Sequence, residues 1–111
     1  MIKVSELWAE VKKVAAEQPD YVCPDEVCRY QIDGKPSCIV GHALHRLGVP
    51  IGDLEALDDA REGGGVPARG IPEELPDLID ADSESALFAL AEAQEAQDNR
   101  LPWGEAVGSV Q

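Results

Sequence analysis

The first 20 residues alternate apolar and charged positions with the spacing of an amphipathic helix. Apolar side chains recur every three or four residues and would line one face of that helix, at Val4, Leu7, Trp8, Val11, Val14 and Ala15. Ser5 is a candidate N-terminal cap, and Pro19 cannot continue a helix. The pattern therefore predicts a helix over 4–17, followed by a turn into an extended segment.

A short hairpin and a second helix are predicted next. Residues 26–32 are compatible with a short strand, and the following Asp33-Gly34 is a tight-turn signal. Ser37 is a favourable N-cap for a helix over 38–47, which Gly48 would end in a left-handed conformation.

The region after residue 50 divides at a segment rich in glycine and proline. A short helix is predicted over 54–60, with Asp53 as its cap. Residues 61–76 contain four glycines and three prolines and are predicted to form a mobile loop. No internal repeat is present.

Two further helices are predicted near the C-terminus. Ser83 or Ser85 would cap a long helix that reaches about residue 99, because an apolar stripe recurs along it at helical spacing. Pro102 suits the first position of a terminal helix through residue 110, whose Trp103 would fold back onto the core.

These elements predict a mainly α fold with a small β-hairpin (α+β), in which residues 1–111 form one compact helical domain. The chain is 44% hydrophobic with few aromatic residues, which favours helices packed on helices around an aliphatic core. No segment has the length of a membrane span or the apolar core of a signal peptide. We therefore expect a cytoplasmic protein with reduced cysteines and no membrane association.

Charge is distributed unevenly along the chain. The formal net charge is −13, which argues against direct binding to nucleic-acid phosphates. Residues 1–50 carry six basic and seven acidic side chains, whereas residues 51–111 carry three basic and fifteen acidic ones. Nearly all of the excess negative charge therefore belongs to the second half.

An acidic surface of this kind has three interpretations: solubility, steering of a protein partner with a basic patch, or imitation of the phosphate array of DNA to block a DNA-binding protein. Candidate partner-binding residues lie on two of the predicted helices, at Asp53, Glu55, Asp58, Asp59, Glu92 and Glu95.

Cysteine and histidine residues form a second candidate site. At helical spacing Cys38, His42 and His45 fall within about 60° of one another on the helix predicted over 38–47. Cys23 and Cys28 precede them, so the pattern C-x4-C-x9-C-x3-H-x2-H supplies enough sulfur and imidazole ligands for a tetrahedral zinc ion. The zinc hypothesis uses Cys23, Cys28, Cys38 and His42, with His45 as an alternative ligand.

A simpler interpretation of the same residues is packing. Neither cysteine pair has the C-x2-C spacing of common zinc sites, and Cys38 is equally suited to a small buried position. A nucleophilic Cys38 activated by His42 would need a third group to orient the imidazole, and the sequence does not place one. We therefore expect no enzymatic activity.

Two motifs give the chain a resemblance to a known group of proteins. The first is Cys38-Ile-Val-Gly41-His-Ala43-Leu44, preceded by Tyr30 and Asp33-Gly34; the second is Gln94-x2-Gln97-Asp98 followed by Trp103-Gly104-x-Ala106-Val107. Together they resemble small uncharacterised proteins of actinobacteriophages and actinobacteria. The chain departs from the expected pattern at Asn99-Arg100, where a glycine-containing turn is expected.

The resemblance implies a phage accessory protein without established enzymatic activity, expressed in the cytoplasm of a bacterial host. Combined with the charge distribution, it predicts a non-enzymatic protein whose acidic C-terminal half binds a host or phage protein. A zinc-stabilised structural module and a DNA-mimic inhibitor are the alternatives.

Overall fold

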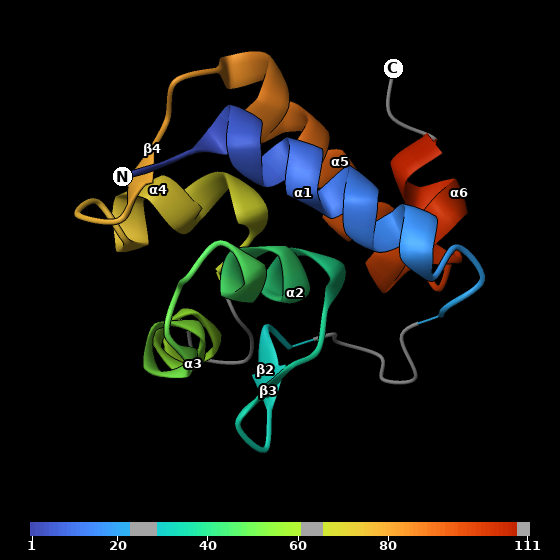
Figure 1. The fold of residues 1–111 in the computed structure, drawn as a ribbon, viewed down its shortest axis with the longest axis horizontal. Coiled ribbons are helices and arrows are strands. Elements are labelled where there is room, and N and C mark those ends of the chain that lie inside the picture. The colour runs from blue at the N-terminus through green and yellow to red at the C-terminus, as the bar shows by residue number, and fades with distance from the viewer. Residues whose placement is uncertain (23–28, 61–65, 109–111) are drawn as a thin grey trace.

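Helix α1, Val4–Glu17, is the element on which the other long helices pack. In the computed structural model, which describes residues 1–22, 29–60 and 66–108, it contacts α2 (Ile39–Arg46), α5 (Glu84–Asp98) and α6 (Trp103–Gly108) (Figure 1). The shorter helical elements are α3 (Ile51–Asp59), the 3-10 helix η1 (Ala68–Gly70) and α4 (Ile71–Glu74). The fold is compact and mainly α, as predicted.

Four two-residue strands complete the secondary structure of the described chain. Strand β1 (Ile2–Lys3) pairs in parallel with β4 (Ile79–Asp80), with Ile2 opposite Ile79. Strand β2 (Gln31–Ile32) pairs antiparallel with β3 (Lys35–Pro36), which is the predicted small hairpin.

The first helix has the predicted bounds and the predicted buried face. Its buried residues are Val4, Leu7, Val11, Val14 and Ala15, while Trp8 is half-buried. The prediction that Ser5 caps this helix is wrong, because the N-cap is Lys3 and Ser5 lies in the first turn.

Asp82, from a distant part of the sequence, accepts hydrogen bonds at the N-terminal end of α1. The Ser5 N–H donates to Asp82 Oδ1 at 3.0 Å, and the Ser5 hydroxyl donates to Oδ2 at 2.6 Å. A free backbone N–H in the first turn of a helix is thus paired with a carboxylate, which the positive end of the helix dipole also favours. These hydrogen bonds lower the pKa of Asp82 below its usual range.

The turn of the hairpin is as predicted, and a carboxylate from α3 holds the hairpin in place. Asp33 and Gly34 both have positive φ, at 54° and 78°, as a two-residue hairpin turn requires. Asp58 Oδ1 accepts from the Tyr30 N–H at 2.8 Å, and Oδ2 accepts from the Gln31 N–H at 3.1 Å. The first part of the strand predicted over 26–32 lies outside the described residues.

Two predicted helix caps are wrong. Helix α2 begins at Ile39 with Cys38 as its N-cap, so Ser37 is not the cap. Helix α3 begins at Ile51 after Pro50, which places Asp53 in the first turn and leaves no side chain as cap. The left-handed end of α2 is confirmed, because Gly48 has a φ of 100°.

The loop predicted over 61–76 is partly wrong. Residues 61–65 lie outside the described chain, but residues 68–74 are helical. Proline is compatible with the first turn of a helix, where its missing N–H would have had no partner, and Pro72 lies there. Ile71 and Leu75 are buried in the core, so apolar packing overrides the many glycine and proline signals.

The start of α5 agrees with the prediction, because Ser83 caps it by accepting from the Ala86 N–H at 3.2 Å. Helix α6 begins at Trp103, one residue after the Pro102 predicted as its first position. The end predicted for this last helix, at residue 110, lies outside the described residues. No helix in the described parts of the chain has the length and apolar character needed to cross a membrane.

Candidate functional site

The residues of the two sequence motifs meet inside the molecule, around the side chain of Gln97. This side chain is fully buried. Its Oε1 accepts from the Ile39 N–H at 2.8 Å and from the Trp103 indole N–H at 3.0 Å. One amide oxygen therefore joins the start of α2, the inner side of α5 and the aromatic ring of α6.

Gln94 makes a second set of contacts, partly buried, three residues earlier on α5. Its Oε1 accepts from the Ala68 N–H at 2.7 Å, and its Nε2 donates to the Tyr30 hydroxyl at 2.8 Å. The Tyr30 hydroxyl in turn donates to the Val66 carbonyl oxygen. Burial raises the pKa of Tyr30, so the phenol remains a proton donor to Val66.

Two of the motif glycines, Gly41 and Gly104, lie where another chain segment approaches closely. A Cβ on Gly41 would lie 2.2 Å from the Tyr30 carbonyl oxygen, and a Cβ on Gly104 would lie 2.9 Å from Pro19 Cβ. We call the set Tyr30, Cys38, Gly41, Gln94, Gln97 and Trp103 the motif core. Within the described chain every buried side-chain nitrogen and oxygen atom has a hydrogen-bond partner, so the motif core is a paired polar network.

Cys38 and the two histidines do not share one face. Cys38 is fully buried, and its Sγ accepts from the Gly41 N–H at 3.1 Å as the N-cap of α2. His45 is exposed. The predicted grouping is wrong because Cys38 has extended φ and ψ of −77° and 166°, so the rotation per helical residue does not apply to it.

His42 packs against an aromatic ring of the core. Its imidazole meets the Trp103 ring edge-on, with centroids 5.4 Å apart and planes at 68°. Tyr21 packs on the same indole at 4.5 Å. Burial lowers the pKa of His42, since the charged imidazolium would lose solvation there.

The zinc hypothesis is tested only in part by these positions. Cys23 and Cys28 lie outside the described residues, so two of its four ligands cannot be placed. Among the residues that the structure describes, no three histidine, cysteine or acidic side chains are grouped as metal ligands. Zinc binding stays a prediction.

The six predicted partner-binding carboxylates fall into two separate groups. Four are on α3, which packs on the hairpin, and two are on α5; these helices lie on opposite sides of α2 in Figure 1. Asp58 is half-buried and bonded to the hairpin, and Asp53 is also partly buried. Glu55, Asp59 and the pair on α5 are exposed.

The solvent-facing side of α5 combines carboxylates with an aromatic side chain. Phe88 is 55% exposed, and exposed glutamates lie four residues before it and four and seven residues after it. We call Glu84, Phe88, Glu92 and Glu95 the outer face of α5. The Arg69 guanidinium lies over the Phe88 ring, 5.1 Å from its centroid.

Sequence reasoning found Glu92 and Glu95 through the charge distribution but missed Phe88. The sequence did indicate that Phe88 is exposed: at 100° per residue it falls outside the apolar stripe of its helix.

Three ion pairs join described residues of the first half. Arg46 binds Glu17 through two hydrogen bonds of 2.6 and 2.8 Å, which join α2 to α1 and lower the pKa of Glu17. Lys13 and Arg46 also contact Glu10. The carboxylates of the outer face of α5 pair with no cation in the described residues, so they are available to an external one.

Comparison with protein-family models, with curated proteins and with solved structures finds no match to this chain.

Proposed function

We propose that this protein is a non-enzymatic interaction protein, and that the outer face of α5 binds a protein carrying a basic patch. The observation that carries the proposal is the exposure of Phe88 among three carboxylates that form no ion pair with residues 1–22, 29–60 or 66–108. Aromatic side chains surrounded by polar groups are typical anchors of protein interfaces.

The charge distribution supports a basic partner. Residues 51–111 carry fifteen of the 22 acidic side chains, and a surface of one sign accelerates encounter with a surface of the other. Charges at the rim of an interface contribute more to association rate and specificity than to affinity. We therefore assign steering to the glutamates and anchoring to Phe88.

Burial of the exposed part of Phe88 by the partner would contribute favourably to the free energy of binding. Complete burial of a phenylalanine side chain contributes about 1.5–3 kcal/mol, so covering the exposed half would contribute about 1 kcal/mol or more. Arg69 already lies over this ring, and an arginine beside an aromatic side chain is a frequent pair in protein interfaces.

The non-enzymatic part of the proposal rests on the use of Cys38 and His42 in packing. The thiol of Cys38 is buried and accepts a backbone hydrogen bond, and the His42 ring packs on Trp103. A nucleophile needs access to substrate and a base within hydrogen-bond distance.

The resemblance to actinobacteriophage proteins suggests where the partner is found. A lysate of an actinobacterial host is the appropriate source, and a partner that uses its basic patch to bind DNA would make this protein a DNA mimic. Competition with duplex DNA for the captured partner separates that case from other basic partners.

The proposal is tested by affinity capture with two variants of equal charge. One replaces Glu84, Glu92 and Glu95 by Gln; the other replaces the exposed Glu55, Glu73 and Asp59 by Gln, Gln and Asn. We expect partners that bind wild type and the second variant at moderate salt but are lost from the first. Equal capture by both variants would contradict the assignment to α5, and the absence of any partner would contradict the function.

Phe88→Ala tests the anchor with the captured partner. We expect the affinity to fall at least about tenfold in calorimetric titration, as for an aromatic residue at the centre of an interface. The variant should melt like wild type, since the replaced ring is mainly in solvent.

A further inference from the structure

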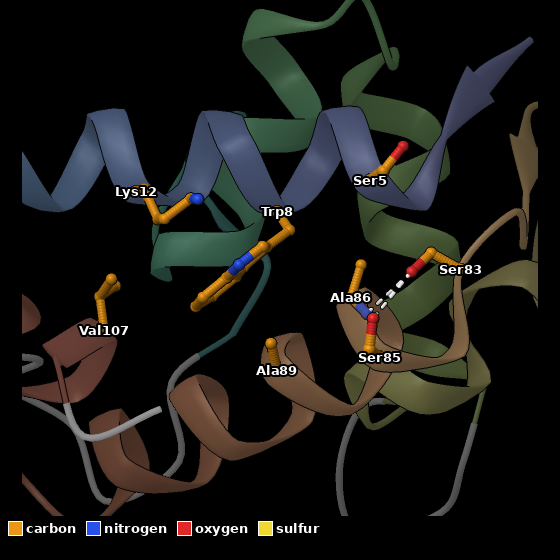
Figure 2. A pocket seen from close by; sticks show the side chains of 8 residues that line it. All are labelled: Ser5, Trp8, Lys12, Ser83, Ser85, Ala86, Ala89 and Val107. Carbon is orange, nitrogen blue, oxygen red and sulfur yellow. Dashed lines mark hydrogen bonds between the residues drawn. The ribbon is translucent and has the colours of Figure 1, made fainter. Parts of the chain in front are cut away.

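A groove of about 500 Å³ lies between α1, α5 and the end of α6 (Figure 2). Its apolar part is formed by Trp8, Ala89 and Val107, and serine hydroxyls lie at the end where α1 and α5 begin. Ser85, Ala86 and Ala89 line it from α5, and no residue of the outer face of α5 is among the lining residues.

The groove differs from the rest of the surface in charge. The chain has 22 acidic and nine basic side chains, yet no carboxylate is among the described residues that line this groove. Lys12 is the one charged side chain among them. The Asp82 carboxylate bonds Ser5 at the serine end, so the positive charge of the groove lies at its Lys12 end, and that end is suited to a ligand with one negative charge.

Lys12 and Trp8 are held together at the centre of the groove. The Lys12 ammonium lies over the indole of Trp8, 5.6 Å from its centroid, and Trp8 is half-buried between α1 and the facing helices (Figure 2). Lys12 has no ion pair in the described chain, whereas the adjacent Lys13 contacts Glu10 at 3.7 Å. The Lys12 ammonium is therefore available to an anionic group, and the Trp8 indole offers an apolar surface against which an aromatic ring can pack.

We propose that this groove binds a small planar molecule carrying one anionic group, such as an aromatic carboxylate. The ring of the ligand packs against Trp8 and Ala89, and its anionic group pairs with Lys12. The volume lies in the range of small-molecule sites, which is about 300–1,000 Å³. A polyanion is disfavoured, because the net charge of −13 repels it at longer range.

The test titrates 2-naphthoate into the full-length protein and follows backbone amide shifts by NMR. We expect saturable shifts at the groove, at Trp8, Ser85 and Ala89. The neutral 2-naphthamide has the same ring and should bind about fivefold more weakly, the range expected for one partly exposed ion pair.

Matched lysine variants locate the anionic group. Lys12→Gln should weaken 2-naphthoate about fivefold, while Lys13→Gln, on the same helix with the same charge change, should leave its binding unchanged. Both lysines are exposed, so neither substitution disturbs the core. Ala89→Leu fills the groove and should remove the shifts.

Three results would overturn the proposal. They are the absence of saturable shifts at the groove, equal binding of naphthoate and naphthamide, and equal weakening by the two lysine variants. Shifts at the groove that depend on protein concentration without ligand, together with a dimer in sedimentation, would instead assign the groove to a second copy of the chain.

Discussion

The two sides of α5 differ in how their polar groups are satisfied. On the inner side, Gln94 and Gln97 place their amides in contact with α2, α6, η1 and Tyr30. On the outer side, Glu92 faces solvent without an ion pair in the described chain, and the exposed ring of Phe88 contacts the Arg69 guanidinium. One helix thus separates residues that stabilise the fold from residues available to another molecule.

This difference explains why the recognisable motifs are poor guides to function here. A buried amide is costly unless its hydrogen bonds are made, so its partners must occupy fixed positions along the chain. Surface carboxylates have no such requirement. The motif core therefore has a definite residue pattern because it is structural, and the binding that we propose uses a surface that has no motif.

The largest expected effect is that of a substitution at Gly41, which disrupts the motif core. Gly41→Ala places a Cβ 2.2 Å from the Tyr30 carbonyl oxygen, which neither backbone can avoid without moving. We expect a loss of about 3 kcal/mol or more in the free energy of unfolding, measured in urea. Gly52→Ala is the control: no atom lies within 4 Å of its new Cβ, and stability should rise by up to about 1 kcal/mol.

Substitutions of Cys38 distinguish its role as a helix cap from a role as a zinc ligand. Cys38→Ala removes the acceptor for the Gly41 N–H and should cost about 1 kcal/mol, whereas Cys38→Ser keeps a capping oxygen and should stay within about 0.5 kcal/mol of wild type. If Cys38 instead binds zinc, Cys38→Ser loses a ligand and should destabilise the protein strongly. Large destabilisation by Cys38→Ser, with wild-type melting that is sensitive to chelator, would favour the zinc site.

The backbone conformation of Arg100, directly after the end of α5, gives a further test. Its φ of 67° is in the left-handed region that favours glycine, at the position where the resemblance leads us to expect a glycine-containing turn. Arg100→Gly should raise stability by about 0.5–1 kcal/mol in urea unfolding. The neighbouring Asn99 has a φ of −87°, so a gain from Asn99→Gly of the same size would refute this explanation.

The smallest expected effect concerns the pH dependence of Asp82. Its pKa is lowered in the folded state by Ser5, so the stabilisation is present above the unfolded value near 3.9 and is lost as the pH falls through the lower folded value. Asp82→Asn should make acid unfolding below about pH 4 less steep. Asp77→Asn should keep the wild-type profile, and identical profiles for all three proteins would contradict this role of Asp82.

Much of the fold follows from local patterns in the sequence. The helical period gives α1 and most of α5, and the Asp33-Gly34 turn and the end of α2 at Gly48 depend on nearest neighbours. Such features need no information from distant residues. They were predicted correctly for that reason.

The remaining features depend on contacts between distant residues. Gln97 bonds the backbone of Ile39, 58 positions away, and Ser5 bonds Asp82, 77 positions away. Helix α4 forms despite its proline because Ile71 is buried by the rest of the chain. Of the candidate sites, charge alone indicated the acidic half, whereas Phe88 was missed although its position outside the apolar stripe of α5 indicated exposure.

The most direct test of this division compares Gln97→Ala with Phe88→Ala in urea unfolding at neutral pH. Gln97→Ala leaves two buried N–H donors unpaired and should lower the free energy of unfolding by about 3 kcal/mol. Phe88→Ala removes an exposed ring and should change it by less than about 1 kcal/mol. Equal losses for the two variants, or a larger loss for Phe88→Ala, would contradict the assignment of the inner side of α5 to folding and of its outer side to binding.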